Sequence, residues 1–255
     1  MKTATKSLLY EFIRQKGNAT VREIIDFTKH HPTGVFKHLK TLQERGIIYK
    51  IGKPPKVRYH AYVHTMRENS PTVRDAMNWA MSGDARFVRQ ATLCQTRDVL
   101  QARTDRLITD LKKMIANENL VYLTVAIASE IGNNSFDHNL GHWRDTPGVY
   151  FYLDTEKRIL ILADRGQGVF ATIQRVRPEV KHDADALQIA FTEMVSGRSP
   201  EKRGNGLKFV KKIIEENQLR LTYYTGRAVA ELQTRGMTIT PGEQTIPGTL
   251  AILQF

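Results

Sequence analysis

Three short segments, far apart in this 255-residue chain, combine glycines with acidic and amide side chains. They are Glu130-Ile131-Gly132-Asn133-Asn134, Asp164-Arg165-Gly166-Gln167-Gly168 and Gly204-Asn205-Gly206-Leu207. The first offers a carboxylate and a carboxamide one helical turn apart, the second an acid after an apolar strand, and the third a glycine pair that opens a helix. These groups suit a nucleoside triphosphate and its metal ion, so the fold must bring the three segments together.

The first segment continues an apolar run at 121–127, and its pattern predicts one helix. Glu130 and Asn134 would then share a face, with Asp137 in the next turn. A carboxamide oxygen suits Mg²⁺, which keeps several waters and bridges phosphate oxygens, so Asn134 is the candidate metal ligand. Glu130 is the candidate general base, because a carboxylate can accept a proton from an attacking water or hydroxyl. The same spacing is also common on helices that bind nothing.

The second segment follows two apolar runs, 149–153 and 158–162, which flank a polar turn and predict a β-hairpin. Asp164 comes just past the second strand, where its carboxylate could accept a hydrogen bond from an exocyclic amine such as that of adenine. Gly166 and Gly168 would let the backbone approach a ligand closely. The alternative interpretation is an ordinary turn after a strand.

The third segment is expected to open a helix at Gly204, Gly206 and Leu207, whose free N–H groups would point at phosphates. Lys202 and Arg203 come just before it and would either meet phosphate charge or form ordinary surface charge. The polar stretch before them, 169–203, is typical of a lid over a ligand site.

In this order the three segments resemble the N box and the two glycine boxes of the GHKL (Bergerat-fold) ATPase superfamily. Its members include gyrase, a class of heat-shock chaperones, mismatch-repair ATPases, histidine kinases and anti-sigma-factor serine kinases. The resemblance covers about residues 120–255, and Gly248-Thr249 before the last strand resembles the closing segment of the family. Lys208 stands where many kinases of the family have a third glycine, and no F box is apparent.

The resemblance implies an α/β sandwich that binds ATP between helices and a lid. It implies Mg²⁺ on Asn134, the adenine amine on Asp164, and the glycines around the phosphates. A glutamate placed like Glu130 is the general base in the hydrolytic members and the serine kinases. Asp137 and Thr249 are further candidates for nucleotide contact.

Positive charge is concentrated at the start of the chain. The net charge is +12, and residues 1–63 hold 13 Lys and Arg against 4 Asp and Glu. Such a segment is expected to meet a polyanion, or to be a solvated surface. Its pattern predicts three helices and a hairpin. The second helix has a capping box from Thr20 to Glu23, and the third begins at Pro32 with Val35, Phe36, Leu39 and Leu42 on its apolar face.

Three helices followed by a hairpin resemble a winged helix-turn-helix, which we assign to residues 1–64. Its third helix would enter the major groove of double-stranded DNA, and the hairpin would reach the neighbouring backbone or minor groove. The candidate DNA-binding residues are Thr33, Lys37, His38 and Lys40 on the helix, and Lys53, Lys56 and Arg58 on the hairpin. The alternative is a module that docks a protein partner or dimerises.

Residues 65–119 are expected to form a helical linker between the two domains. Within it, 85–117 reads as one long helix in which Leu93, Leu100, Leu107 and Met114 recur every seven residues. The repeat indicates either a partner helix from a second copy of the chain, giving a homodimer, or a helix packed on its own domain.

Composition narrows the classes of function. No apolar run approaches the roughly 20 residues that span a bilayer, and the single cysteine, Cys94, fits a reducing cytoplasm. Residues 65–137 contain no histidine, which argues against a histidine autokinase. The sequence therefore predicts an ATP-binding transcriptional regulator. The alternative is a serine kinase of the anti-sigma type, or an ATPase, with the winged helix as a docking module.

Overall fold

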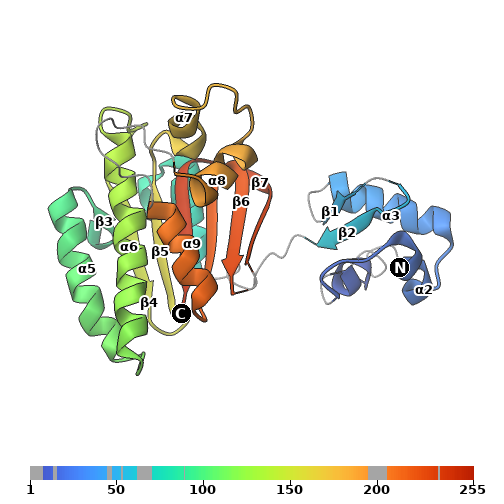
Figure 1. Ribbon diagram of the computed structural model, residues 1–255, viewed down its shortest axis with the longest axis horizontal. Coiled ribbons are helices and arrows are strands. Elements are labelled where there is room, and N and C mark those ends of the chain that lie inside the picture. The colour runs from blue at the N-terminus through green and yellow to red at the C-terminus, as the bar shows by residue number, and fades with distance from the viewer. Residues whose placement is uncertain are drawn as a thin grey trace. The chain divides into compact units, whose positions relative to one another are not determined.

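The computed structural model describes residues 8–13, 16–44, 48–52, 54–61, 71–88, 90–194, 206–234 and 236–255. The chain divides into two compact units, Met1–Glu68 and Asn69–Phe255 (Figure 1). Each unit has a hydrophobic core of its own.

The first unit contains helices and one small sheet. Residues 8–13 are helical and are followed by α2 (Val21–Thr28) and α3 (Pro32–Glu44). Strands β1 (Ile48–Ile51) and β2 (Arg58–Ala61) form an antiparallel pair, and an isolated bridge joins Ala19 to Tyr59. Among the described residues of this unit, the buried core consists of Leu9, Ile13, Ala19, Ile24, Val35, Leu39, Leu42, Ile48 and Tyr59.

The start of α2 follows directly from its sequence. The Thr20 hydroxyl accepts from the Glu23 backbone N–H, and the Glu23 carboxylate accepts from the Thr20 backbone N–H, which completes the predicted capping box. Phe36 on α3 departs from the prediction because it is 52% exposed, and Phe27 on α2 is exposed to a similar degree, 49%. Phe36 therefore lies outside the core, whereas Val35, Leu39 and Leu42 are buried as expected.

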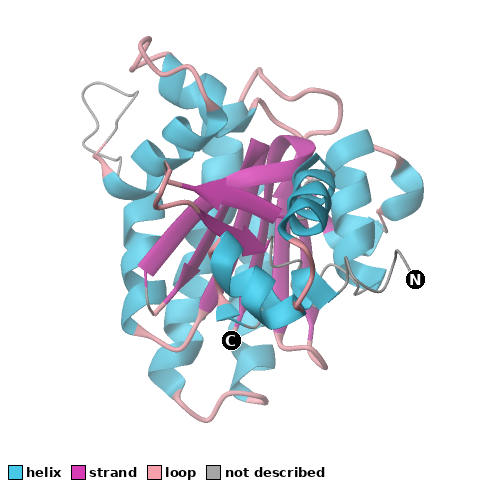
Figure 2. Ribbon diagram, turned by 90° about the vertical axis from the view of Figure 1, so that its right-hand side faces the viewer, coloured by secondary structure: helices cyan, strands magenta, loops and turns pink. Residues whose placement is uncertain are grey.

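The second unit is a mixed α/β structure built on one antiparallel sheet. The strand order is β3 (Leu93–Cys94), β4 (Val149–Asp154), β5 (Ile159–Asp164), β7 (Gly236–Gln254) and β6 (Arg220–Gln233). Every neighbouring pair is antiparallel. The strands, magenta in Figure 2, bury side chains on both faces because successive residues of a strand point to opposite sides.

Helices cover both faces of this sheet. One face contributes Phe151, Leu160 and Leu162 to a core shared with α5 (Arg97–Lys112), α6 (Glu118–Asn139), α8 (Asp183–Thr192) and α9 (Gly206–Glu216). Figure 1 shows α6 and α9 side by side in front of the strands. The other face packs Tyr150 and Ile161 against α4 (Pro71–Ser82). A short helix, α7 (Gly168–Gln174), follows β5.

The segment 65–119 differs from its prediction. Two 3-10 turns, η1 (Ala85–Phe87) and η2 (Gln90–Thr92), and strand β3 precede the helix, which begins only at Arg97. Leu93 and Cys94 pair with Tyr150 and Val149, so this stretch is an edge of the sheet. Both α4 and α5 belong to the Asn69–Phe255 unit rather than to a separate linker, and the boundary falls near residue 68 rather than 64.

The expected heptad seam is part of the core. Leu100, Leu107 and Leu111 are buried against α6 and the sheet, and Met114 packs against the same cluster. Leu93 packs on the other face, with α4. A core-facing helix shows the same spacing of leucines as a coiled coil, and here its own sheet supplies the partner surface.

Strand β6 bends sharply at its middle. The register with β7 shifts on both sides of Gly226, which has a φ of +54°, and Asp183 at the start of α8 accepts from the Arg227 backbone N–H at 2.9 Å. Beyond the bend the strand runs back toward the end of α9. The hydrogen bond from the Thr234 hydroxyl to the Asn217 carbonyl, 3.2 Å long, shows this return. The tip of the β6–β7 hairpin therefore lies beside the C-terminal end of α9.

No helix in the described part of the chain is both long enough and apolar enough to cross a membrane.

Candidate functional site

Asp164 ends strand β5 as a buried carboxylate, only 1% exposed. Its Oδ1 accepts from the Gly166 backbone N–H at 2.8 Å and from Asn139 Nδ2 at 3.2 Å. Its Oδ2 accepts from the Ser135 hydroxyl at 2.9 Å and from the Thr249 hydroxyl. Four donors thus surround one carboxylate, which is the number of lone-pair sites that it offers.

Burial dominates the electrostatics of this carboxylate. It raises the pKa of Asp164, because the charged form loses its solvation, while the hydrogen bonds from Thr249, Gly166, Ser135 and Asn139 act in the lowering direction. The pKa of Tyr223, which is also buried, is raised by desolvation and by the negative charge of Asp164. The end of β5 therefore carries a polar side chain that is shielded from solvent inside the unit.

Two of the donors were not predicted from the sequence. Ser135 and Asn139 lie one turn apart on α6 and are 5% and 4% exposed. The sequence contains a sign of their burial, because these two polar residues are spaced i and i+4 on the same helix face as the buried Ile131. The sequence did not say which buried group they contact. The Ser135 hydroxyl also reaches the Ile131 carbonyl at 3.4 Å, so it has a second acceptor within its own helix.

Gly166 is required by close packing at the same point. A Cβ on Gly166 would lie 1.9 Å from Asn139 Cγ, a distance that no side chain could accommodate. Asn139 also accepts, through Oδ1, from the Gln167 backbone N–H at 3.0 Å. Gly168 has a φ of +78° and opens α7, so a left-handed residue begins that helix. The Asp164 to Gly168 loop is thus fixed against the C-terminal turn of α6.

The predicted helix around the first segment is present as a single helix. Glu130 and Asn134 lie on α6 and are half-buried, on the side that faces α9. A Cβ on Gly206, the first residue of α9, would lie 2.6 Å from Glu130 Oε2 and 3.3 Å from Asn134 Nδ2. The structure therefore brings the first and third segments together at the start of α9. Leu207 is partly buried and packs against the core.

Helix α6 connects the two groups of contacts. Ser135 and Asn139 reach Asp164, while Glu130 and Asn134 face Gly206. Thr249, predicted from the closing segment, lies opposite Asp164 in the β5–β7 register and donates to it. Residues from all three predicted segments and from the closing segment are thus arranged along one helix.

Asp137 is engaged elsewhere. Its Oδ1 lies 2.5 Å from Arg97 Nη2 at the start of α5, so an ion pair links these two helices. Arg97 also lies over the Phe136 ring, and that ring packs edge-on against Trp143. Asn139, two residues later, is the side chain that reaches Asp164 instead. Lys202, Arg203 and Gly204 lie outside the described residues.

Arg165 follows Asp164 and is a structural cation, 3% exposed. Its guanidinium donates to the Trp79 and Ala80 carbonyls at 3.1 and 2.6 Å, which satisfies the C-terminal end of α4. It also forms a two-point ion pair with Asp145, and this partner lowers the pKa of the Asp145 carboxyl. A Cβ on Gly83, the residue that follows α4, would lie within 2.9 Å of the guanidinium, so a side chain there would displace Arg165.

The candidate DNA-binding residues are mostly on the surface of the first unit. Thr33, Lys37 and Lys40 are exposed along α3, whereas His38 is half-buried. Lys56 and Arg58 are exposed at the hairpin, and Arg58 donates to Asn18 Oδ1 at 2.7 Å. Lys53 lies outside the described residues.

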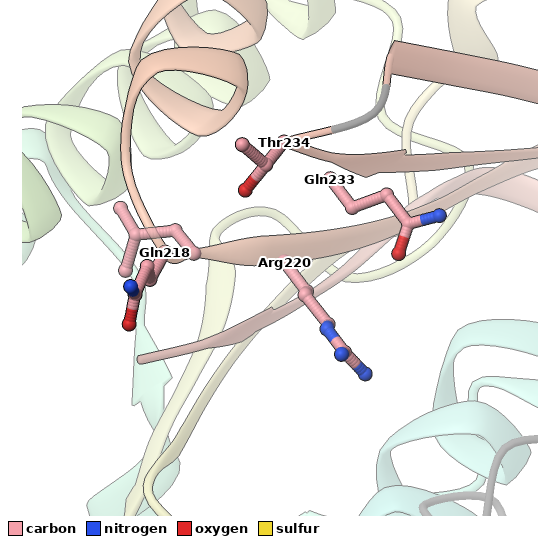
Figure 3. Close-up of a pocket in the computed structure, with 5 residues that line it drawn as sticks. Gln218, Arg220, Gln233 and Thr234 are labelled. Atoms are coloured by element: carbon pink, nitrogen blue, oxygen red, sulfur yellow. The ribbon is translucent and has the colours of Figure 1, made fainter.

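A cavity of about 480 Å³ lies in the second unit, lined by Gln218, Leu219, Arg220, Gln233 and Thr234. Figure 3 shows Gln218 and Arg220 near the start of strand β6, and Gln233 and Thr234 near its end. None of the predicted ligand residues lines this cavity. No group of three or more His, Cys, Asp or Glu side chains within the described residues is arranged to hold a metal ion.

A scan against models of known protein families finds no match for this chain, and a search of curated protein sequences finds none either.

Proposed function

We propose that the Asn69–Phe255 unit binds ATP with Mg²⁺ beside α6, as a nucleotide-binding domain of the GHKL type. The observation that carries this proposal is the alignment of two contacts along α6. Asp164 meets Ser135 and Asn139 at one level, and Gly206 meets Glu130 and Asn134 at another. An acceptor for an amine and a helix start for phosphates are therefore held by one rigid element.

The donor set around Asp164 fits an adenine amine if one donor can turn away. Ser135 can do so, because its hydroxyl has the Ile131 carbonyl as an alternative acceptor at 3.4 Å. That rotation frees a lone pair on Oδ2, while the Gly166 and Asn139 contacts keep the carboxylate in place. Burial strengthens the resulting hydrogen bond because water does not compete for it.

The start of α9 fits a phosphate group with its Mg²⁺ ion. Gly206 leaves no side chain between the first turn of α9 and the amide of Asn134, whose oxygen is a suitable ligand for a hydrated Mg²⁺. Bound Mg²⁺ would neutralise phosphate charge. Glu130 would accept the proton of an attacking water or hydroxyl, which makes it the catalytic residue of this proposal.

The first unit supports a role in DNA binding. Four of the candidate basic residues that the structure describes, Lys37, Lys40, Lys56 and Arg58, have exposed side chains on the third helix and the hairpin. The helix and hairpin order and the excess of positive charge fit a winged helix-turn-helix. We therefore propose an ATP-binding transcriptional regulator, in which nucleotide biases DNA binding through different affinities for two states.

The second candidate is an enzyme, either an ATPase or a protein serine kinase that uses the first unit to dock its substrate. The placement of Glu130 beside the start of α9 supports this candidate, because a carboxylate there could accept a proton from an attacking water or hydroxyl. Incubation with γ-labelled ATP separates the two activities. Free labelled phosphate indicates hydrolysis, and label on a second protein indicates a kinase.

Calorimetric titration of the full chain with a non-hydrolysable ATP analogue and Mg²⁺ tests the proposal. We expect saturable binding, a loss of at least about tenfold in Asp164→Asn, and no loss in the matched surface variant Asp105→Asn. Asn134→Ala should lose the Mg²⁺-dependent part of the affinity. A folded wild-type chain that gives no heat of binding with the analogue or with ADP would overturn the proposal.

A further inference from the structure

The outer side of α3 carries an exposed aromatic ring. Among the α3 positions whose side chains the structure describes, the exposed ones are Pro32, Thr33, Phe36, Lys37 and Lys40. Phe36 is 52% exposed, whereas Val35, Leu39 and Leu42 on the opposite side are buried in the core of the first unit. The helix therefore has an inner apolar face and an outer face on which one phenyl ring stands among polar groups.

Phe36 has neighbours suited to a nucleic acid. Thr33 and Lys40 lie three and four residues from it along the helix, and Lys37 follows it directly, so these side chains share the outer face. Lysines on the same face can neutralise phosphates, and residues 1–63 carry 13 Lys and Arg against 4 Asp and Glu. Charge therefore favours a polyanion over an apolar protein groove as the partner of this face.

Base-edge chemistry limits what this face can read. Arginine or lysine recognises guanine, asparagine or glutamine recognises adenine, and acidic residues recognise cytosine, whereas apolar groups contact the C5-methyl group of thymine. None of the five exposed α3 residues is Arg, Asn, Gln, Asp or Glu. Apart from the lysines, the groups available for base contact are the Pro32 and Phe36 rings and the hydroxyl and methyl groups of Thr33. A threonine hydroxyl bonds to more than one kind of base edge, so the apolar groups are the ones that can favour one base.

We propose that Phe36, with Thr33, selects thymine in the major groove through its C5-methyl group. This inference rests on the proposed DNA-binding function. Both residues lie in the first two turns of α3, which is the part of a recognition helix that meets base edges. Burial of the methyl against the ring removes apolar surface from water, and this is the source of the preference.

The test begins with duplexes enriched by the full chain from a random-sequence pool at low salt. In the enriched duplex, each thymine is replaced in turn by deoxyuridine, which lacks only the methyl group. Replacement at the contacted position should weaken binding about fourfold, the factor for one buried methyl-sized group. Replacement at uncontacted positions should have no effect.

A double-mutant cycle then assigns the effect to the ring. Phe36→Ala should weaken binding to the thymine duplex and remove the difference between thymine and deoxyuridine, while Phe36→Leu keeps part of it. Phe27→Ala is the matched control, because Phe27 is exposed to a similar degree on α2. It should leave the thymine-to-deoxyuridine ratio unchanged.

The outcomes separate the two proposals. Specific duplex binding with a ratio that Phe36→Ala does not change would overturn the assignment of Phe36 and leave DNA binding standing. Enriched duplexes in which no thymine can be distinguished from deoxyuridine would do the same. Absence of any retained duplex at low salt would overturn both.

Discussion

Asp164 and Arg165 are consecutive residues whose side chains contact opposite helical layers of the same unit. Asp164 accepts from Ser135 and Asn139 on α6, and Arg165 donates to the carbonyls of Trp79 and Ala80 at the end of α4. Alternation along a strand explains this arrangement, because neighbouring side chains point to opposite faces. The end of β5 therefore joins both layers at one point.

Replacement of Arg165 tests the contact between the end of β5 and the end of α4. Arg165→Met should lower the free energy of unfolding by about 2–4 kcal/mol, because two α4 carbonyls lose their donor inside the protein. Asp145→Asn should cost less, about 1 kcal/mol, because Asp145 is partly exposed and solvent screens its charge. Urea unfolding followed by circular dichroism measures both. Equal losses of unfolding free energy in the two variants would mean that the ion pair with Asp145, rather than the capping of α4, provides the stability.

Replacement of Glu130 tests its proposed role as general base. Glu130→Gln keeps the size and position of the side chain beside Gly206 but cannot accept a proton. Nucleotide affinity should stay within about threefold, and any turnover of ATP should fall by roughly 10²–10⁴-fold, the usual contribution of a positioned base. Phosphate release under saturating ATP provides the measurement, and unchanged turnover would remove Glu130 from the mechanism.

Gly206→Ala tests whether a side chain at the start of α9 weakens nucleotide binding without changing the stability of the protein. The new methyl would lie 2.6 Å from Glu130 Oε2, which sits at the far end of a flexible side chain and can move. The free energy of unfolding should therefore change by less than about 1 kcal/mol, since alanine also favours a helix over glycine. Affinity for the ATP analogue should fall about tenfold or more. Gly34→Ala, where a Cβ meets nothing within 4 Å, is the control and should leave nucleotide binding intact.

Leu107→Ala distinguishes a core helix from a dimer seam. Leu107 is 2% exposed and belongs to the core cluster with α6 and the sheet, so truncation should cost about 2–5 kcal/mol of unfolding free energy. The molecular mass in solution should not change. Size-exclusion chromatography with light scattering provides the check, and a shift to half the mass would show that the leucines also face a second copy.

The raised pKa of Asp164 predicts a pH-dependent stability. Burial favours the protonated carboxyl in the folded state, so the contribution of Asp164 is complete below its unfolded pKa of about 3.9 and is lost as the pH rises through the folded value. Asp164→Asn does not titrate. The unfolding free energy of the wild type, measured relative to that of Asp164→Asn, should therefore decrease as the pH rises above about 4. An increase over the same range would mean that the four hydrogen bonds outweigh burial.

The sequence predicted the parts of this site that depend on local pattern. The α6 helix and the position of Asp164 at a strand end both follow from apolar periodicity and agree with the structure. Ser135 and Asn139 were missed because a polar side chain on a helix face does not reveal its tertiary partner. The short strand β3 was read as helix, because two residues carry too little pattern to identify a strand.

The buried face of a helix was harder to predict from the sequence than the helix itself. Phe36 was assigned to the core because an aromatic residue next to Val35 extends the apolar stripe of α3, yet the helix buries only a narrow face. The leucines at 100 and 107 predict either a partner helix from a second copy or a helix packed on its own domain, and the structure agrees with the second alternative because the surface that covers them belongs to the same unit. Periodicity gives the direction of a side chain and not the identity of its neighbour.

The return of β6 after Gly226 has a mechanical consequence for α9. The first residue of this helix abuts Glu130 and Asn134, and its far end receives the hairpin tip through the Thr234 hydroxyl and the Asn217 carbonyl. If this eleven-residue helix moved along its axis, the hydrogen bond between Thr234 and Asn217 would have to break. A force applied to its leading turn would be resisted at the opposite end, about 17 Å away at 1.5 Å per residue.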